Sequence, residues 1–443
     1  MPRGIVRTLA ALLTLSLSHS DANAQPSTVT LTLEEAIAQG LANSMRVAEL
    51  QARVEAAEAV EQGRAAARLP IVSLQAGYLR TNHIEEFAIV QPGQPFQVLY
   101  PDIPDNYRSR LDLQWPIYTS GRADALERAA RAEREAAGED LEAARADLRL
   151  EISRAFWALV TARETAIVVD RSLDSIEAHV RDLRNRLQQG LIPPNEVLTG
   201  ETQLARDRLL AIEAENARAI AEADLQRLLG VEKDQALQPR ATLEPASAAP
   251  AAPADVARSV ESDRAERRAL VDRLEAANAR SVAAAAAARP QVGVGAGYDY
   301  ARPNPRIFPR SGEWEDSWDV SVNVSWALWD AGRNRAERAE AAAAASGLKA
   351  RLADLDRQIA FEIRQRQVEL ASNRAAVPVA DDAVKAAAEA LRVLGERFNA
   401  GVATSTEVLD AQTDVIQSEL SLKRALANVR LAEARLERAV GRR

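Results

Sequence analysis

The feature that most constrains this chain is an unbroken heptad pattern between Leu148 and Leu187. All twelve of its a and d positions are apolar, and charged or polar residues dominate the positions between them. An apolar repeat of 3.5 residues makes a narrow seam, which a second helix must cover in a left-handed supercoil. No proline lies within residues 122–189, so the pattern predicts one helix about 68 residues long, on the order of 100 Å. A helix of that length is typical of a strut or a tube wall.

The same pattern occurs a second time, 211 residues further on, between Ile359 and Phe398. Ten of its twelve a and d positions are apolar. The offset of 211 also pairs Trp115 with Trp326, Gly121 with Gly332, Gly190 with Gly401 and Glu196 with Glu407. Further upstream an offset of 220 pairs Pro70 with Pro290 and Tyr78 with Tyr298. The chain is therefore predicted to consist of two structural repeats.

The N-terminal residues predict export. Arg3 and Arg7 precede an apolar run, and Ala22-Asn23-Ala24 supplies a cleavage site, so residues 1–24 are expected to be a signal peptide. Its removal takes away two positive charges and one negative charge, which changes the net charge from −8 to −9. An acidic chain offers no basic surface for nucleic acid. The absence of cysteine excludes disulfides, thiolate metal sites and a lipidated N-terminal cysteine.

Each repeat is expected to contain a helix, two strands, a long helix and a return helix. In the first repeat (25–230) we expect a helix at 32–68, strands at about 71–80 and 107–118, a long helix at 122–189 and a return helix at 195–229. A Pro/Ala-rich linker should follow at 231–254. In the second repeat (255–443) we expect a helix ending near 289, strands at about 291–301 and 317–329, a long helix at 333–400 and a return helix at 406–440.

Three local signals refine these boundaries. Thr32 and Glu35 form a capping box at the start of the first helix. Prolines in residues 92–104 predict an exposed, irregular loop between the first two strands. Pro378 lies inside the second long helix and should kink it or interrupt its hydrogen bonds.

The four strands have one wholly apolar face each. Of the twelve Trp and Tyr residues only Trp157 lies outside the strands and their loops, and these rings favour the interface between membrane and water. The expected interface aromatics are Tyr78, Trp115, Tyr118, Tyr298, Trp318, Trp326 and Trp329. The alternative is a hydrophobic core where the strands pack on helices. Four strands cannot close a barrel alone and lipid does not tolerate open sheet edges, so the chain is expected to oligomerise.

With these features the chain resembles the TolC-like outer-membrane efflux proteins. The resemblance covers residues 31–441 and rests on two strand exits, LQWPIYTSGR and VSWALWDAGR, and on two helical tips, RLQQGLIPPNEVL and RFNAGVATSTEVLDAQ. It implies a mainly α fold with four β-strands, in which long antiparallel coiled-coil helices continue from a β-barrel contributed by three protomers. It also implies an outer-membrane location with a long periplasmic extension.

The function that this resemblance implies is an exit duct of a tripartite efflux or type I secretion system. The implied partners are a periplasmic adaptor protein, an inner-membrane pump and outer-membrane lipid, in addition to two further copies of the chain. Since pump and adaptor select the cargo in this family, the sequence does not indicate whether drugs, metals, other small molecules or proteins are transported.

The helical tips carry the remaining candidate sites. Gly190 and Gly401 stand where the long helices end, in a position that favours positive φ. The resemblance implies that the adjacent Leu191 and Val402 are presented for adaptor docking. Thr404 and Glu407 read as a second capping box, and Asp410 lies close behind it in the same helix. The resemblance adds that Glu407 and Asp410 line the periplasmic aperture of the tube. Phe398 and Ala403 depart from the tyrosine and the basic residue of some relatives.

Two other classes of function compare less well with the sequence. An enzyme is not indicated, because the mature chain has two histidines, His83 in a loop and His179 on a solvated helix face, and no nucleophile, phosphate-binding or metal-ligand motif. No cofactor or metal is expected. A periplasmic coiled-coil adaptor or scaffold is the alternative reading, because it also has long helical hairpins. It would lack the four aromatic-rimmed strands.

Overall fold

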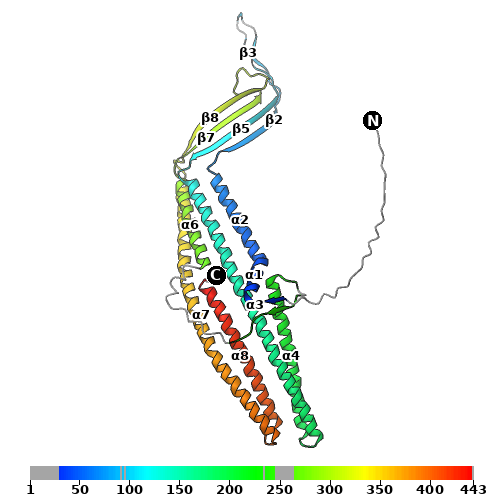
Figure 1. The fold of residues 1–443 in the computed structure, drawn as a ribbon. Coiled ribbons are helices and arrows are strands. Elements are labelled where there is room, and N and C mark those ends of the chain that lie inside the picture. The colour runs from blue at the N-terminus through cyan, green and yellow to red at the C-terminus, as the bar shows by residue number, and fades with distance from the viewer. Residues whose placement is uncertain (1–28, 90–91, 94–95, 233–234, 245–263, 442–443) are drawn as a thin grey trace, which may run out of the picture.

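The structure, a computed structural model, describes residues 29–89, 92–93, 96–232, 235–244 and 264–441. The expected signal peptide at 1–24 lies outside these ranges. The described chain is elongated, with a four-stranded sheet at one end and long helices running away from it to two hairpin tips at the other (Figure 1). Its elements occur in two similar sets, as the repeat predicts.

The first set comprises β1 (Val29–Leu31), α1 (Leu33–Asn43), α2 (Met45–Ala66), β2 (Ile71–Arg80), β3 (Phe87–Ile89), β4 (Gln97–Tyr100), β5 (Asp105–Tyr118), α3 (Arg122–Gln188) and α4 (Pro194–Leu229). The second set comprises β6 (Leu237–Pro239), α6 (Ala265–Ala286), β7 (Gln291–Arg302), β8 (Glu315–Ser325), α7 (Arg333–Asn399) and α8 (Ser405–Ala439). The long and return helices agree with their predicted bounds to within one residue at each end.

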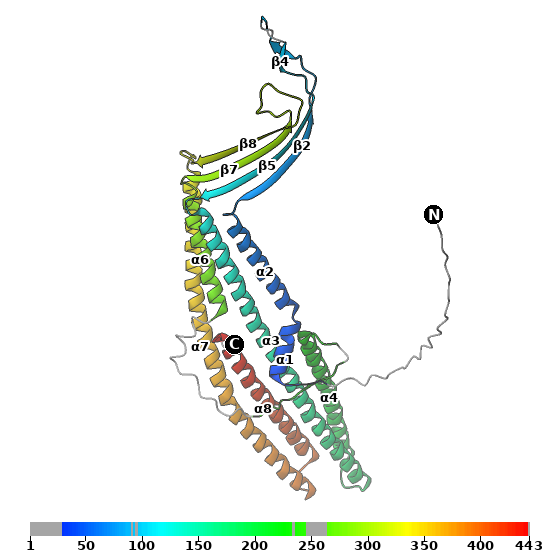
Figure 2. The same ribbon diagram turned by 45° about the horizontal axis from the view of Figure 1, so that its top comes forward.

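The two long helices begin in the same way. A pair of residues with positive φ joins each strand exit to its helix: Ser120 and Gly121 before α3, and Ala331 and Gly332 before α7. The heptad seam of α3 is buried or half-buried throughout, as is its counterpart on α7. α7 remains helical on both sides of Pro378. The seams therefore pack as predicted, with α4 on α3 and α8 on α7 (Figure 2).

The expected single helix at 32–68 is wrong. Thr32 and Glu35 form the predicted capping box, but the chain breaks at Ser44 into α1 and α2. Ser44 is extended, and its hydroxyl accepts a hydrogen bond from the Val47 amide, which caps α2. Next to it, Asn43 Nδ2 donates to the Leu229 carbonyl at the end of α4. Because of this break, α1 contacts both α3 and α4 in the middle of the molecule, which we call the waist.

The sheet has the order β2-β5-β7-β8, and each neighbouring pair is antiparallel. Its register places the apolar positions on one face: Leu74 lies opposite Leu111, Leu111 opposite Tyr298, and Tyr298 opposite Trp318. The polar positions share the other face, where Arg110 lies opposite Asp299. The predicted alternation is confirmed along the paired parts of the four strands as far as Trp115 in β5, where a β-bulge between Pro116 and Tyr118 takes Ile117 out of the register.

Two predictions about the strands are wrong. β8 ends at Ser325 rather than near 329, because its partner β7 begins at Gln291 and the preceding Pro290 cannot donate to a ladder. The loop after β2 is not wholly irregular. β3 and β4 pair antiparallel within it and project beyond the sheet (Figure 2).

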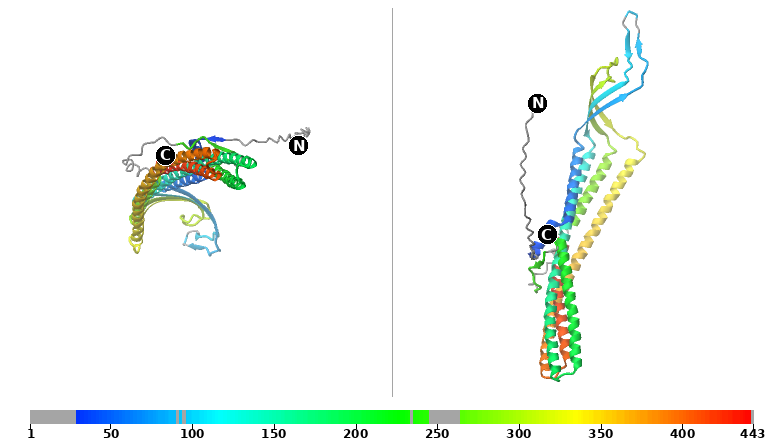
Figure 3. Two further views of the ribbon diagram at one scale, coloured as in Figure 1. Left: turned by 90° about the horizontal axis from the view of Figure 1, so that it is seen from below. Right: turned by 90° about the vertical axis from the view of Figure 1, so that its right-hand side faces the viewer.

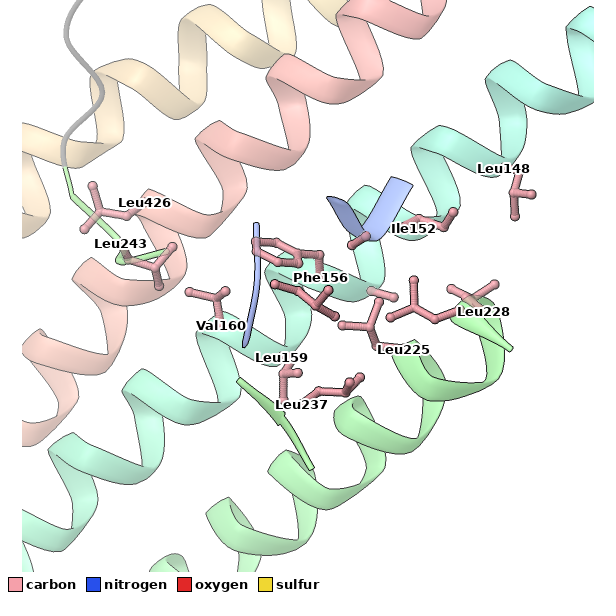
Figure 4. Close-up of a cluster of buried hydrophobic side chains, with 14 residues drawn as sticks. Leu148, Ile152, Phe156, Leu159, Val160, Leu225, Leu228, Leu237, Leu243 and Leu426 are labelled. Carbon is pink, nitrogen blue, oxygen red and sulfur yellow. The ribbon is translucent and has the colours of Figure 1, made fainter. Parts of the chain in front are cut away.

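The main hydrophobic core lies at the waist, where α1, α3, α4 and α8 meet (Figure 4). Phe156, Ile152 and Leu159 of α3 are fully buried there against Leu225 and Leu229 of α4. Part of the predicted linker contributes to this core. β6 pairs in parallel with β1, which puts Leu237 opposite Val29, and residues 245–263 lie outside the described ranges. The waist thus fixes the helices between the sheet and the tips.

Candidate functional site

In the sheet, apolar side chains are exposed on one face, whereas a charged side chain is buried on the other. On the apolar face the side chains are open: Trp318 is 72% exposed, and Leu74, Val320, Val322 and Val324 are also exposed. On the polar face Asp299 is only 2% exposed. A continuous apolar face of this kind marks a surface made for lipid or for another protein, since water would disfavour it.

The aromatic side chains gather at both ends of the strands. At the end far from the helices, Tyr78 packs on Tyr107 with ring centroids 5.0 Å apart, and Trp314 stacks on Tyr300 at the same distance. The sequence prediction missed Tyr107, Tyr300 and Trp314, since a face of the sheet brings them together. Tyr298 and Trp318 lie opposite each other on the apolar face.

At the helical end the two repeats make the same contact. The indole N–H of Trp115 donates to the carbonyl of Arg68, and that of Trp326 donates to the carbonyl of Ala288, each at 3.1 Å. Each tryptophan therefore ties a strand exit to the end of the helix that precedes the sheet. Tyr118 and Trp329, three residues beyond each tryptophan, are exposed. All seven predicted interface aromatics lie exposed on the described chain.

The helical tips also repeat one geometry. Gly190 and Gly401 have φ of 72° and 75°, as predicted for the residue after a helix end. The amides of Leu191 and Val402 donate to the carbonyls of Arg186 and Arg397 at 2.9 Å, which closes each long helix. The side chains of Leu191 and Val402 point outward and are 68% and 63% exposed.

A small core joins the two tips. Leu183 and Val197 from the first hairpin pack with Phe398 and Val408 from the second. The guanidinium of Arg186 lies 4.5 Å from the Phe398 ring centroid. Phe398 thus contributes an apolar contact between the hairpins.

The placement of His179 on a solvated face is wrong. Its Nε2 atom lies 3.1 Å from the Ser405 hydroxyl oxygen, and its ring lies 5.5 Å from that of Phe398. Burial lowers the pKa of His179, Asp182 raises it and Arg186 lowers it further. The heptad gave no sign of this contact, because it comes from the second hairpin. His83 lies in a loop as expected, with Nδ1 2.6 Å from an Asp102 carboxylate oxygen.

Glu407 and Asp410 lie on one exposed face of α8, opposite the buried Val408 and Leu409. The predicted capping box is present: the Glu407 carboxylate accepts from the Thr404 amide at 2.7 Å, and the Thr404 hydroxyl accepts from the Glu407 amide. The hydrogen bond from the Thr404 amide lowers the pKa of Glu407. Both carboxylates are therefore available to solvent or to a neighbouring chain.

The described part of the chain contains neither a membrane-spanning helix nor a candidate metal site. No helix there is both long and apolar enough to cross a membrane. Within the same ranges, no three His, Asp or Glu side chains are grouped so that they could hold a metal ion.

Residues 36–231 and 260–442 match the protein family described as outer membrane efflux protein. The chain belongs to this family. The family description places the chain in the outer membrane. The match covers both tips and most of both repeats, and it leaves out residues 1–35, 232–259 and 443.

The fold is similar to that of CusC, which forms a transmembrane channel, with 16% identity over 92% of each chain and a TM-score of 0.79. It is also similar to the outer membrane protein VceC of Vibrio cholerae, with 21% identity, a TM-score of 0.78 and coverage of 92% of this chain and 96% of that one. In sequence, the chain is 28% identical over 202 residues to the protein CyaE of Bordetella pertussis. That alignment spans 46% of this chain and 40% of CyaE.

Proposed function

We propose that three copies of this chain form the outer-membrane exit duct of a tripartite efflux or type I secretion system. The observation that carries the proposal is the sheet: its apolar face is exposed, and the outer edges of β2 and β8 pair with no further strand in the described chain. An adaptor or scaffold protein in the periplasm would gain nothing from such a face. Twelve strands from three copies would bury the edges and turn the apolar faces to lipid.

The repeat predicts how neighbouring copies pair. Within the chain, β5 of the first repeat pairs with β7 of the second. The offsets of 211 and 220 residues transfer this pairing to β8 of one copy and β2 of the next. Leu113 lies opposite Ala296, so Val324 should lie opposite Ala76 of the neighbour. The same pairing would extend β8 beyond Ser325, as β5 extends to Tyr118.

Disulfide cross-linking tests this register, because the natural chain has no cysteine. Directly opposed residues of antiparallel strands have Cα atoms about 4.5–5.5 Å apart, within the range of a disulfide. We expect Ala76→Cys with Val324→Cys to give a covalent trimer on mild oxidation. The matched control is Gln75→Cys with Val324→Cys, in which the two thiols lie on opposite faces of the sheet. Equal cross-linking of both pairs, or of neither, would contradict the proposed pairing.

The tips are proposed to dock on a periplasmic adaptor. Support comes from the outward Leu191 and Val402, which two identical glycine turns present side by side at the end of the molecule (Figure 1). Leu191→Glu with Val402→Glu should abolish export and leave the trimer and its strand content unchanged. Export that survives in this variant would show that the adaptor binds elsewhere.

Glu407 and Asp410 are proposed to line the periplasmic aperture. Three copies would bring two rings of three carboxylates together, about one helical turn apart, which favours a bound cation. Glu407→Gln with Asp410→Asn keeps the capping box and removes the charge. In single-channel recordings this variant should lose block by divalent cations with unchanged helix content. Persistent block would leave both residues as parts of the helix start only.

The division of the chain remains part of the same proposal. Residues 1–24 would be removed on export, and residues 231–254 would join repeats at 25–230 and 255–443. N-terminal sequencing of the outer-membrane protein should therefore start at Gln25. A start within the apolar run would show that another cleavage site is used.

A further inference from the structure

A belt of six charged side chains crosses the polar face of the sheet. It consists of three cations and three anions joined by ion pairs: Arg108, Arg110, Arg306, Asp112, Asp299 and Asp319. We refer to this set as the arginine–aspartate belt. It is continuous from β5 across β7 to β8, and Arg306 reaches it from the loop between β7 and β8.

Arg110 is at the centre of this belt. Its guanidinium pairs with Asp299 on β7, with Asp112 on its own strand at 2.7 Å, and with Asp319 on β8 at 3.2 Å. No other residue of the belt pairs with all three aspartates. Asp299 is almost fully buried beneath Arg110 and Arg108, and Arg108 Nε donates to it at 2.6 Å.

Gly297 makes this arrangement possible. It lies on β7 between Asp112 and Asp319 in the register, on the same polar face. A Cβ atom at this position would overlap the Arg110 guanidinium and would lie 3.0 Å from Asp319 Oδ1. Gly293 and Gly295 precede it at alternate positions, so this part of β7 has no side chains on the polar face. Arg110 can therefore pass over β7 and reach β8.

We propose that Arg110 keeps the belt at zero net charge and thereby prevents the outer section of the duct from selecting ions by charge. This inference rests on the proposed function, in which the polar face lines the lumen. Rings of uncompensated charge select ions in pores, whereas a ring of balanced pairs does not. The outer section then passes cargo of either sign, and charge discrimination is left to Glu407 and Asp410 at the tips.

A purely structural role is the competing explanation, because the belt also joins three strands. Buried ion pairs are weak evidence for stability in themselves, since desolvation offsets their attraction. The two roles differ in what they predict for variants of equal disruption and opposite charge. A structural role predicts the same effect for both, whereas a selectivity role predicts effects of opposite sign.

The test uses reversal potentials in a potassium chloride gradient, with the full-length protein in planar bilayers. All variants are made in the Glu407→Gln, Asp410→Asn background, so that the tips do not dominate the selectivity. Arg110→Gln leaves each belt with a net charge of −1 and should shift permeability towards potassium. Asp299→Asn leaves +1 and should shift it towards chloride. The double variant restores zero and should return to the background value.

Asp319 lies half-exposed at the edge of the belt, and Asp319→Asn also leaves the belt with a net charge of +1. This variant should likewise shift permeability towards chloride, and it serves as the test if the Asp299 variant does not form trimers. Resistance of the trimer to dissociation in detergent is checked for each protein. Equal permeability ratios in the background protein and its single variants would overturn this inference and leave the duct intact. Failure of the background protein to conduct at all would instead overturn the proposed function, and the inference with it.

Discussion

α3 and α7 are related by the repeat and are both 67 residues long, yet they differ sharply in burial. Twenty residues of α3 are buried, against five of α7. α3 contacts α2 and α4 in its own repeat and α6 and α8 in the other. Among the described elements, α7 contacts only α6 and α8 strongly, and it forms one edge of the curved layer of helices (Figure 3).

The low burial of α7 shows where a single copy of the chain leaves helix surface uncovered. α3 contacts α6 and α8 of the other repeat, and the repeat counterparts of these two helices are α2 and α4. Repeat symmetry therefore predicts that α7 contacts α2 and α4 of the next copy. Exposed apolar residues are present on both surfaces: Phe361, Val368 and Val379 on α7, and Leu209 and Ile212 on α4. The layer of helices also curves, so copies added at its two edges can close into a tube (Figure 3). The burial of α3 within one copy thus predicts that helices of a second copy cover α7.

The largest effect is expected when one charge is placed at equivalent positions of the two helices. Val168 of α3 is 5% exposed, and its repeat counterpart Val379 of α7 is 69% exposed. An unpaired buried carboxylate costs several kcal/mol, which is a large part of a stability of about 5–15 kcal/mol. Val168→Glu should therefore leave no folded protein in the membrane. Val379→Glu should fold and lose the trimer, as judged by chromatography and circular dichroism.

The outcome that would contradict the comparison is a pair of variants with the same behaviour. If Val379→Glu assembled normally, α7 would not be covered by a second copy. If Val168→Glu folded, the burial of α3 would not decide the fold of the chain.

A smaller effect is expected at His179, where α3 contacts the second hairpin and its counterpart Ala390 on α7 is exposed. Burial lowers the pKa of His179, so the unfolded chain binds its proton first as the pH falls. Stability should therefore decline from about pH 6.5 down to the lowered pKa of the folded protein and then level off. His179→Gln should show a weaker decline of Tm between about pH 7 and pH 5. Parallel curves for both proteins would argue against this contact.

The smallest effect is expected at Asp207 of α4, a buried residue whose counterpart Ser418 on α8 is half-exposed. Its Oδ1 atom accepts from Gln203 Nε2 at 2.9 Å, and its Oδ2 atom has no hydrogen-bond partner among the described residues. Burial raises the pKa of Asp207, so its contribution to stability is present at low pH and is lost as the pH rises from about 4 through the raised value. Asp207→Asn should raise Tm by a few degrees at neutral pH and by less at pH 4. Equal gains at both pH values would rule out the titration of Asp207 as the cause.

Much of the fold could be predicted because its signals are local. Glycines mark the ends of α3 and α7, and the Thr404 and Glu407 capping box marks the start of α8, so these bounds were accurate. Alternation alone identified the faces of the strands. The tip sites could be named only through the family resemblance, because exposure and capping do not reveal a partner.

The features that escaped prediction depend on contacts between distant residues. The break at Ser44 is coupled to the end of α4 through Asn43 and Leu229. The position of His179 is set by Ser405, 226 residues away. The arginine–aspartate belt left a signal in the alternating charges of β5 and the alternating glycines of β7, but only the register of the sheet brings Arg110 and Asp319 together.

The central claim is that one copy is an incomplete sheet and an incomplete tube, and that three copies complete both. The most direct test is the mass of the protein in detergent, measured by light scattering with the detergent contribution subtracted. We expect a particle of about three times the 48.1 kDa chain mass, slightly less after removal of the signal peptide. A stable monomer with full strand content would contradict it.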